Sequence, residues 1–287
     1  MRKLYLISFI LMVVCLGCQW HLKPASNDEK AERMVIERYD RIEHLYLTTA
    51  DFAALQQMKT VYPMQTRMLI EDVLKLGRVD ESDINTRFLL FFQDSTLQVL
   101  IREVERQYAD IDDLSDQLNE AFERLTKMLP SLPLPSVYAQ IGSLDQSIIA
   151  GNGLLGISLD KYLGSDHPLY LRFGYTDEQR RMMTRQFIVP DCLGFYLMSL
   201  YPPVTDEDGD VHVAKIQYVV NQAMKQKFFT HAAVQQVEKY MSQHPEVSVE
   251  QLLSSGRTER SLYQMQEQIV AAVHMTELSV IAKALDA

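Results

Sequence analysis

The sequence predicts an α+β fold that is predominantly helical, with a small antiparallel sheet between two helical halves. Apolar residues recur at helical spacing through residues 32–129 and again through 208–287. Dense prolines at Pro130–Pro135 cannot continue a helix, so they end the first half. Short alternating segments around a glycine-rich turn then indicate a sheet-containing core over residues 136–200. We expect these parts to form one domain over residues 32–287.

The first helical half is predicted from apolar stripes whose members lie three or four residues apart. Such a stripe covers one face of a helix, and its expected role is core packing. The densely apolar run Phe88–Phe92 adds to this core. The stripes are Val35, Tyr39, Ile42 and Tyr46; Met68, Leu69, Val73 and Leu76, which Gly77 ends; Leu97, Leu100, Ile101 and Val104 within Ser95–Tyr108; and Leu118, Ala121, Phe122 and Leu125 within Asp112–Met128.

The sheet is predicted from three short segments, Val137–Ile141, Gln146–Ala150 and Leu154–Leu159. The sequence Gly151-Asn152-Gly153 between the last two suits the positive φ angles of a tight hairpin turn. We therefore expect the second and third strands to pair directly.

Helices are expected again after the hairpin. Thr176–Gln179 and Ser248–Gln251 have the spacing of capping boxes, which open helices. Asp191–Leu200 is a further expected helix, with Pro190 tolerated near its first turn. Two more stripes predict an amphipathic helix with Val213, Ile216, Val220 and Met224, and a long carboxy-terminal helix with Leu262, Met265, Ile269, Val273 and Val280.

The beginning of the chain predicts export and lipid attachment. A charged start leads into the apolar run Leu4–Leu16, which is shorter than the roughly 20 residues of a membrane span. Cys18 after Leu-Gly resembles a lipobox, although Cys15 stands where leucine is usual. We expect residues 1–17 to be a lipoprotein signal peptide and residues 18–31 a tether.

In such a lipoprotein, Cys18 becomes the acylated amino terminus, with fatty acids such as palmitate as its anchor. An ordinary cleaved signal that leaves Cys18 as a spare thiol and an uncleaved anchor helix are the alternatives. The body then contains Cys192 alone, so no internal disulfide is expected. The net charge of −10 argues against nucleic-acid binding and against adhesion to anionic lipid through a basic face.

Sequence motifs for catalysis and metal binding are missing. No two of the seven histidines lie four residues apart, and there is no nucleophile elbow, P-loop or dinucleotide fingerprint. The acidic run Asp206–Asp210 fails as a calcium loop, because Val211 and Gln217 occupy the glycine and glutamate positions. We therefore expect no catalytic residue, no metal and no cofactor.

Two alternatives to this expectation stay open. Cys192 could act as a thiol nucleophile, although a small buried apolar side chain is the preferred interpretation. His167, His212 and His231 could converge from distant segments into a zinc site.

An ordered series of segments carries a family resemblance. SVYAQIGSLDQS at 136–147 and LGISLDKYLG at 155–164 are followed by PLY at 168–170 and IVPD at 188–191. With the lipobox, this series resembles the GldB-like family of gliding-motility lipoproteins over about residues 35–202. The family-motif positions, of unknown role, are Asp145, Asp160, Tyr162 and Asp191.

The resemblance implies an envelope lipoprotein whose core is similar to a zincin-type metallopeptidase fold. The helix where such peptidases carry HExxH reads IVPDCLGF at 188–195, so Pro190 and Gly194 supply no imidazole. Likeness of fold does not confer activity. Gln235–Leu253 resembles the family's closing helices after an apparent deletion of a tryptophan-rich stretch.

The expected function is that of a non-enzymatic scaffold or binding subunit in an envelope machine related to gliding motility. Its expected partners are the membrane, through the lipid, and envelope proteins. The resemblance implies an outer-membrane anchor. No acidic cluster follows Cys18 directly, so we expect the body to face the periplasm. The alternatives are a divergent zincin-like hydrolase that uses carboxylates such as Asp145, Asp160 and Asp191, and capture of a peptide or glycan in a cleft.

Overall fold

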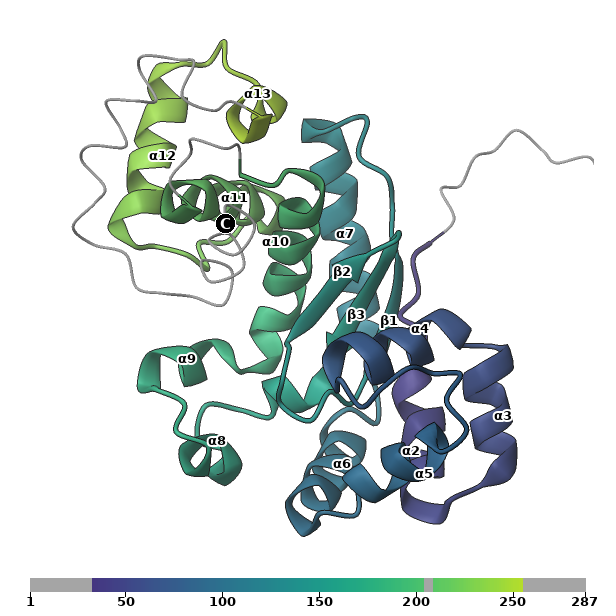
Figure 1. The fold of residues 1–287 in the computed structure, drawn as a ribbon. Helices are drawn as coiled ribbons and strands as arrows, with labels where there is room; N and C mark the ends of the chain where they lie inside the picture. Colours follow the sequence, from purple (N-terminus) through teal and green to yellow (C-terminus); the bar gives the residue numbers. More distant parts are fainter. Residues whose placement is uncertain (1–32, 204–208, 255–287) are drawn as a thin grey trace, which may run out of the picture. The chain divides into compact units, whose positions relative to one another are not determined.

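The structure, a computed structural model, describes residues 33–203 and 209–254. Apart from Arg33, these residues belong to one compact unit that begins at Met34. The unit has an α+β fold that is mostly helical, as predicted (Figure 1). The predicted signal peptide, the tether and the long carboxy-terminal helix lie outside the described residues.

In the described residues, helices precede and follow one three-stranded sheet. Before the sheet come α2 (Tyr39–Thr49), α3 (Phe52–Thr60), α4 (Pro63–Arg67), the π-helix η1 (Met68–Val73), α5 (Ile84–Phe91), α6 (Ser95–Gln107) and α7 (Asp112–Met128). After it come η2 (Leu159–Tyr162), α8 (Pro168–Arg172), α9 (Asp177–Met182), η3 (Arg185–Phe187), α10 (Ile188–Leu200), α11 (Gly209–Met224), α12 (Ala232–Gln243) and α13 (Val249–Ser254).

The strongly periodic helices form where the sequence predicts them. α7 has the predicted bounds, and both predicted capping boxes form, at Thr176 and at Ser248. The predicted α7 stripe is buried throughout: Leu118, Ala121, Phe122 and Leu125. Burying one leucine or phenylalanine side chain stabilises the fold by about 1.5–3 kcal/mol.

Two helix predictions are wrong in detail. Val35 is 67% exposed rather than part of a helical stripe, because the chain there is still extended. Glu37 forms a parallel bridge with Tyr138 through two backbone hydrogen bonds of 2.9 Å to the neighbouring strand. α11 is buried on most of its surface, including His212 and Lys215, rather than amphipathic. Tertiary contacts decide both outcomes.

The sheet has the order β1-β3-β2, with β1 at Ser136–Gln140, β2 at Ile148–Gly151 and β3 at Leu154–Ser158. β2 and β3 are antiparallel and joined by the predicted hairpin, whose central residues Asn152 and Gly153 have φ of 52° and 74°. β1 pairs parallel to β3, so the prediction of an antiparallel sheet is wrong and the sheet is mixed.

This topology places the connection between β1 and β2 across the end of β3. β1 and β3 end side by side, since Gln140 is opposite Ser158. β2 lies on the far side of β3, so residues 141–147 must cross the end of β3 to reach it. η2 begins directly after Ser158 and therefore lies at the same end of the sheet.

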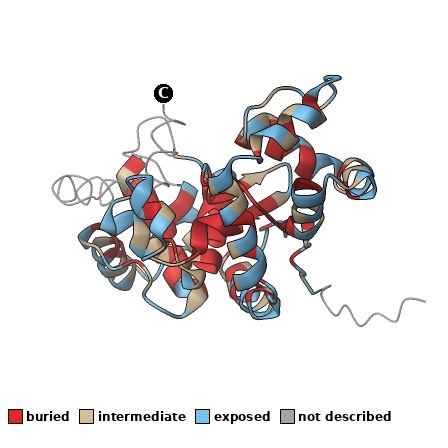
Figure 2. Cartoon of the chain, turned by 90° about the horizontal axis from the view of Figure 1, so that it is seen from below, coloured by how far each residue is buried: buried red, intermediate tan, exposed pale blue. Residues whose placement is uncertain are grey.

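Helices cover the sheet and complete the core. α10 packs against β2 and β3, whereas α2 packs against β1, so the sheet lies between these two helices (Figure 1). Residues 188–198 of α10 are all buried, and buried residues gather around the strands (Figure 2). Within the described residues, no helix is both long enough and apolar enough for a membrane span.

Candidate functional site

The connection over residues 141–147, here called the braced loop, has an unusual backbone. Ser143 and Leu144 have φ of 54° and 65°, and neither is glycine. A non-glycine residue in the left-handed region costs on the order of 1–3 kcal/mol and persists only when its surroundings hold it there. Two consecutive residues of this kind therefore require strong support from neighbouring groups.

Asp160 of η2 supplies that support through its carboxylate. Its carboxylate is fully buried, and its two oxygens accept hydrogen bonds from the backbone N–H groups of Gly142, at 2.7 Å, and Leu144, at 2.5 Å. Burial raises the pKa of Asp160, and the two backbone donors oppose that rise. The most deeply buried of the family-motif carboxylates thus fixes the backbone of a loop.

The carbonyl of Leu144 is held as well. It accepts a hydrogen bond from the Tyr175 hydroxyl at 2.9 Å, and the Lys161 ammonium lies 3.5 Å from the same oxygen. Lys161 is buried and lies 4.8 Å from the centre of the Tyr175 ring, a cation–π distance. Both backbone polar groups of Leu144 therefore have partners inside the fold.

Glu43 of α2 braces the start of the same loop, and sequence reasoning missed it. Its fully buried carboxylate accepts a hydrogen bond from the Ile141 N–H at 2.8 Å through Oε2. Burial, and then the nearby Asp160 and Asp40 carboxylates, raise its pKa well above the usual glutamate range. No local signal marks Glu43, because its partner lies 98 residues away in the chain.

Close packing also shapes the loop. A Cβ at Gly142 would lie 2.5 Å from Oγ of Ser158 on β3, closer than side-chain carbons approach such atoms. The absence of a side chain at Gly142 lets the loop cross the strand end at this distance.

Tyr162 and Asp191 form a separate buried contact. The Tyr162 hydroxyl donates a 2.8 Å hydrogen bond to Oδ2 of Asp191, which joins η2 to α10. The carbonyl of Tyr162 accepts from the Tyr108 hydroxyl at 2.5 Å, which joins η2 to the end of α6. These contacts fix the element that carries Asp160.

The fourth family-motif position differs from the other three. Asp145 is exposed in the braced loop, whereas Asp160, Tyr162 and Asp191 are buried. The three carboxylates of the hydrolase alternative therefore serve different contacts, with Asp160 on backbone N–H groups and Asp191 on a tyrosine.

The histidines and the cysteine of the two open alternatives also have separate surroundings. Nε2 of His212 lies 2.7 Å from the Tyr201 carbonyl, and the His167 ring packs on Tyr170. Cys192 is buried in α10, and burial raises the pKa of its thiol. Within residues 33–203 and 209–254, no three His, Cys, Asp or Glu side chains are grouped so that they could hold a metal ion.

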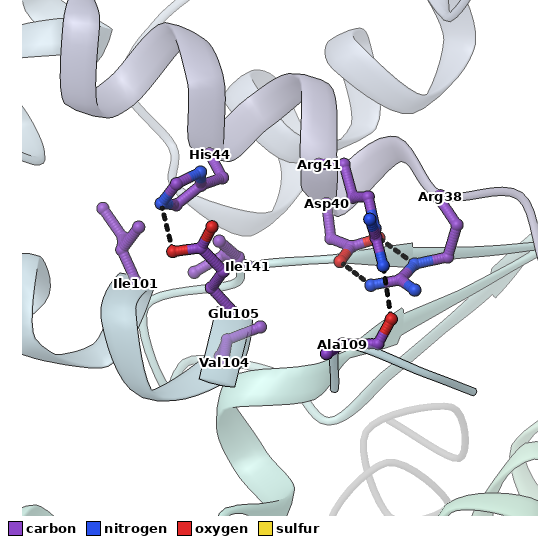
Figure 3. A pocket seen from close by; sticks show the side chains of 9 residues that line it. All are labelled: Arg38, Asp40, Arg41, His44, Ile101, Val104, Glu105, Ala109 and Ile141. Atoms are coloured by element: carbon purple, nitrogen blue, oxygen red, sulfur yellow. Dashed lines mark hydrogen bonds and ion pairs between the residues drawn. The ribbon is translucent and has the colours of Figure 1, made fainter. Parts of the chain in front are cut away.

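A hollow of about 270 Å³ lies between α2 and α6, here called the α2–α6 hollow (Figure 3). Its charged groups bind one another or the backbone. Arg38 makes a bidentate ion pair with Asp40 and reaches the Tyr108 carbonyl at 2.7 Å. Arg41 donates to the Ala109 carbonyl, as Figure 3 also shows.

His44 and Glu105 complete this pattern, with Nε2 and Oε2 3.2 Å apart across the hollow. The polar side chains at this place join α2 to the last turn of α6 and the residues after it. The α2–α6 hollow is therefore a polar packing seam, and its charges are already engaged.

These contacts describe an α+β protein in which buried carboxylates hold a strained loop across one end of a small mixed sheet. The family model described as gliding motility protein GldB matches residues 21–234, which is most of the chain. The chain therefore belongs to the GldB family and is a gliding-motility-associated protein.

Comparison with curated proteins and with solved structures finds no match. The family match begins after Cys18 and ends within α12 at residue 234. The acylation of Cys18, the zincin-like character of the core and the likeness of Gln235–Leu253 to the closing helices stay predictions.

Proposed function

We propose that this protein is a lipid-anchored, non-enzymatic binding subunit of a cell-envelope machine related to gliding. The observation that carries the proposal is the use of Asp160: both oxygens of this buried family-motif carboxylate hold the braced loop. The loop in turn displays Asp145, the exposed family-motif position, to solvent.

A rigid loop suits binding better than chemistry by these carboxylates. A general acid or base must reach its substrate within hydrogen-bond distance. Asp160 has no exposed surface, and its oxygens are engaged by backbone donors. A loop that is fixed in advance binds with a smaller loss of conformational entropy than a mobile one.

Crosslinking in the native envelope tests the binding role. A photoreactive residue at Asp145 is expected to give a discrete adduct with another envelope protein. The matched control is the same residue at Asp166, another exposed aspartate, in the segment before α8. Identical adducts, or none, at both positions would contradict a partner site at the braced loop.

The anchor is tested separately by metabolic labelling with a fatty-acid probe. The apolar run before Leu-Gly-Cys18 supports acylation at Cys18. Wild-type protein should carry the label and Cys18→Ala should not; a labelled Cys18→Ala protein would overturn the anchor. Digestion of the body by protease added to intact cells would contradict the periplasmic placement.

A further inference from the structure

A second hollow, here called the loop hollow, lies beside the braced loop and encloses about 360 Å³. One wall is the braced loop itself, from Ser143 to Asp145, and another is the end of η1 with the following Lys75. Aromatic side chains, Phe91, Phe173 and Tyr175, complete the lining. This volume lies in the range of small-ligand and side-chain pockets.

Backbone strain concentrates at this hollow. Lys75, Ser143 and Leu144 all line it, and all have left-handed φ, at 52°, 54° and 65°. Lys75 also follows closely on the π-helix η1. Strained residues and π-helices both occur preferentially at functional sites. Two segments far apart in sequence thus hold unfavourable backbone conformations at one place.

The charges of the loop hollow are available to a ligand. Lys75 and Asp145 are both exposed, and neither side chain forms a hydrogen bond or an ion pair within the part of the chain that the structure describes. In the α2–α6 hollow, by contrast, the Arg38 guanidinium is engaged by Asp40 and Tyr108.

The apolar part of the lining is also accessible. Phe173, which lines the hollow together with Phe91 and Tyr175, is 56% exposed. Aromatic side chains, phenylalanine included, are enriched in the cores of protein interfaces relative to the rest of the surface. A ligand that matches the lining therefore carries an apolar group together with one negative and one positive charge.

We propose that the loop hollow binds a segment of a partner protein in which an aromatic or aliphatic residue lies between an acidic and a basic residue. The partner's carboxylate pairs with Lys75, its ammonium or guanidinium with Asp145, and its apolar side chain packs on Phe173. This inference rests on the proposed binding function and names the chemistry of the partner. An uncharged glycan would make no use of the opposite charges.

Titration of the purified full-length protein with end-capped tripeptides tests the inference. Acetyl-Asp-Phe-Lys-amide and acetyl-Lys-Phe-Asp-amide are compared with the uncharged acetyl-Asn-Phe-Gln-amide, followed by NMR or calorimetry. At least one charged peptide should bind more tightly than the uncharged one. Lys75→Gln and Asp145→Asn should each weaken it about two- to fivefold, the scale of an exposed ion pair.

Charge exchange sharpens the test. Lys75→Glu combined with Asp145→Lys should reverse the preference between the two charged tripeptides, whereas Lys239→Glu combined with Asp166→Lys, on other exposed residues, should leave it unchanged. Equal binding of all three tripeptides, or tighter binding of chitotriose that does not depend on Lys75 or Asp145, would overturn the inference. A discrete crosslink at Asp145 without tripeptide binding would retain the proposed function and remove this inference alone.

Discussion

The α2–α6 hollow and the loop hollow enclose about 270 Å³ and about 360 Å³, and both are lined by cations, carboxylates and apolar side chains. In the first, Arg38 and Asp40 form a bidentate pair that also reaches the backbone after α6. In the second, Lys75 and Asp145 face solvent and the backbone is strained. The two hollows are therefore similar in size and differ in the partners of their charged groups, which is why we propose only the loop hollow as a binding site.

The largest expected effect is loss of the carboxylate beneath the braced loop. Asp160→Ala removes the acceptor for the N–H groups of Gly142 and Leu144 and leaves both buried. Each unsatisfied donor costs about 1–3 kcal/mol, so we expect unfolding in urea to show a loss of about 3–5 kcal/mol. Asp145→Ala is the matched control and should change stability by less than about 0.5 kcal/mol. Equal losses for the two variants would remove the distinction between them.

The next effect comes from steric crowding at the strand end. Gly142→Ala places a Cβ 2.5 Å from Ser158 Oγ, and we expect a loss of about 1–3 kcal/mol. Gly151→Ala in the hairpin is the control, because a Cβ there meets no atom within 4 Å. Thermal melting of the two variants compares them directly. A melting temperature unchanged by Gly142→Ala would show that the loop can move away from β3.

A smaller effect is expected at the packing seam. Arg38→Ala leaves the buried Asp40 carboxylate without its bidentate partner, which should cost about 1–2 kcal/mol in urea unfolding. Lys75→Ala in the loop hollow should stay within about 0.5 kcal/mol of wild type, since its side chain is exposed. A larger loss of stability for Lys75→Ala than for Arg38→Ala would mean that the loop hollow, and not the α2–α6 hollow, has the structural role.

The smallest expected effect is a change in pH dependence at Glu43. Because burial raises its pKa in the folded state, folding favours the protonated carboxyl, and this contribution to stability declines as pH rises through the raised pKa. Glu43→Gln should flatten that decline and change stability at neutral pH by less than about 1 kcal/mol. Urea unfolding at a series of pH values measures the slope, with the exposed Glu250→Gln as control. The same slope in both variants would contradict the role of Glu43.

Local patterns in the sequence were sufficient for much of the fold. Three features could be predicted because each depends on residues only a few positions apart. They are the α7 stripe, the capping box at Thr176 and the hairpin at Asn152. The ordered series of segments likewise pointed to the family, and the family match confirms that resemblance. The roles of the four family-motif positions stay predictions.

The pairing of strands was beyond such patterns. A short alternating segment like Val137–Ile141 fits a parallel or an antiparallel neighbour equally well. The hairpin fixes β2 beside β3, and β1 then occupies the remaining edge of β3 in the parallel direction. The backbone at Glu37 is extended rather than helical because it pairs with Tyr138 of β1, which lies far away in the sequence.

By itself, the sequence determined the mainly helical α+β class, the hairpin and the family, because each depends on local periodicity or on ordered motifs. Only the tertiary structure decided that Asp160 and Glu43 hold the braced loop and that Lys75 and Asp145 line one hollow. These groups come from segments far apart in the chain. The hydrogen bonds of Asp160 and Glu43 to the braced loop arise only when the topology carries residues 141–147 across the end of β3.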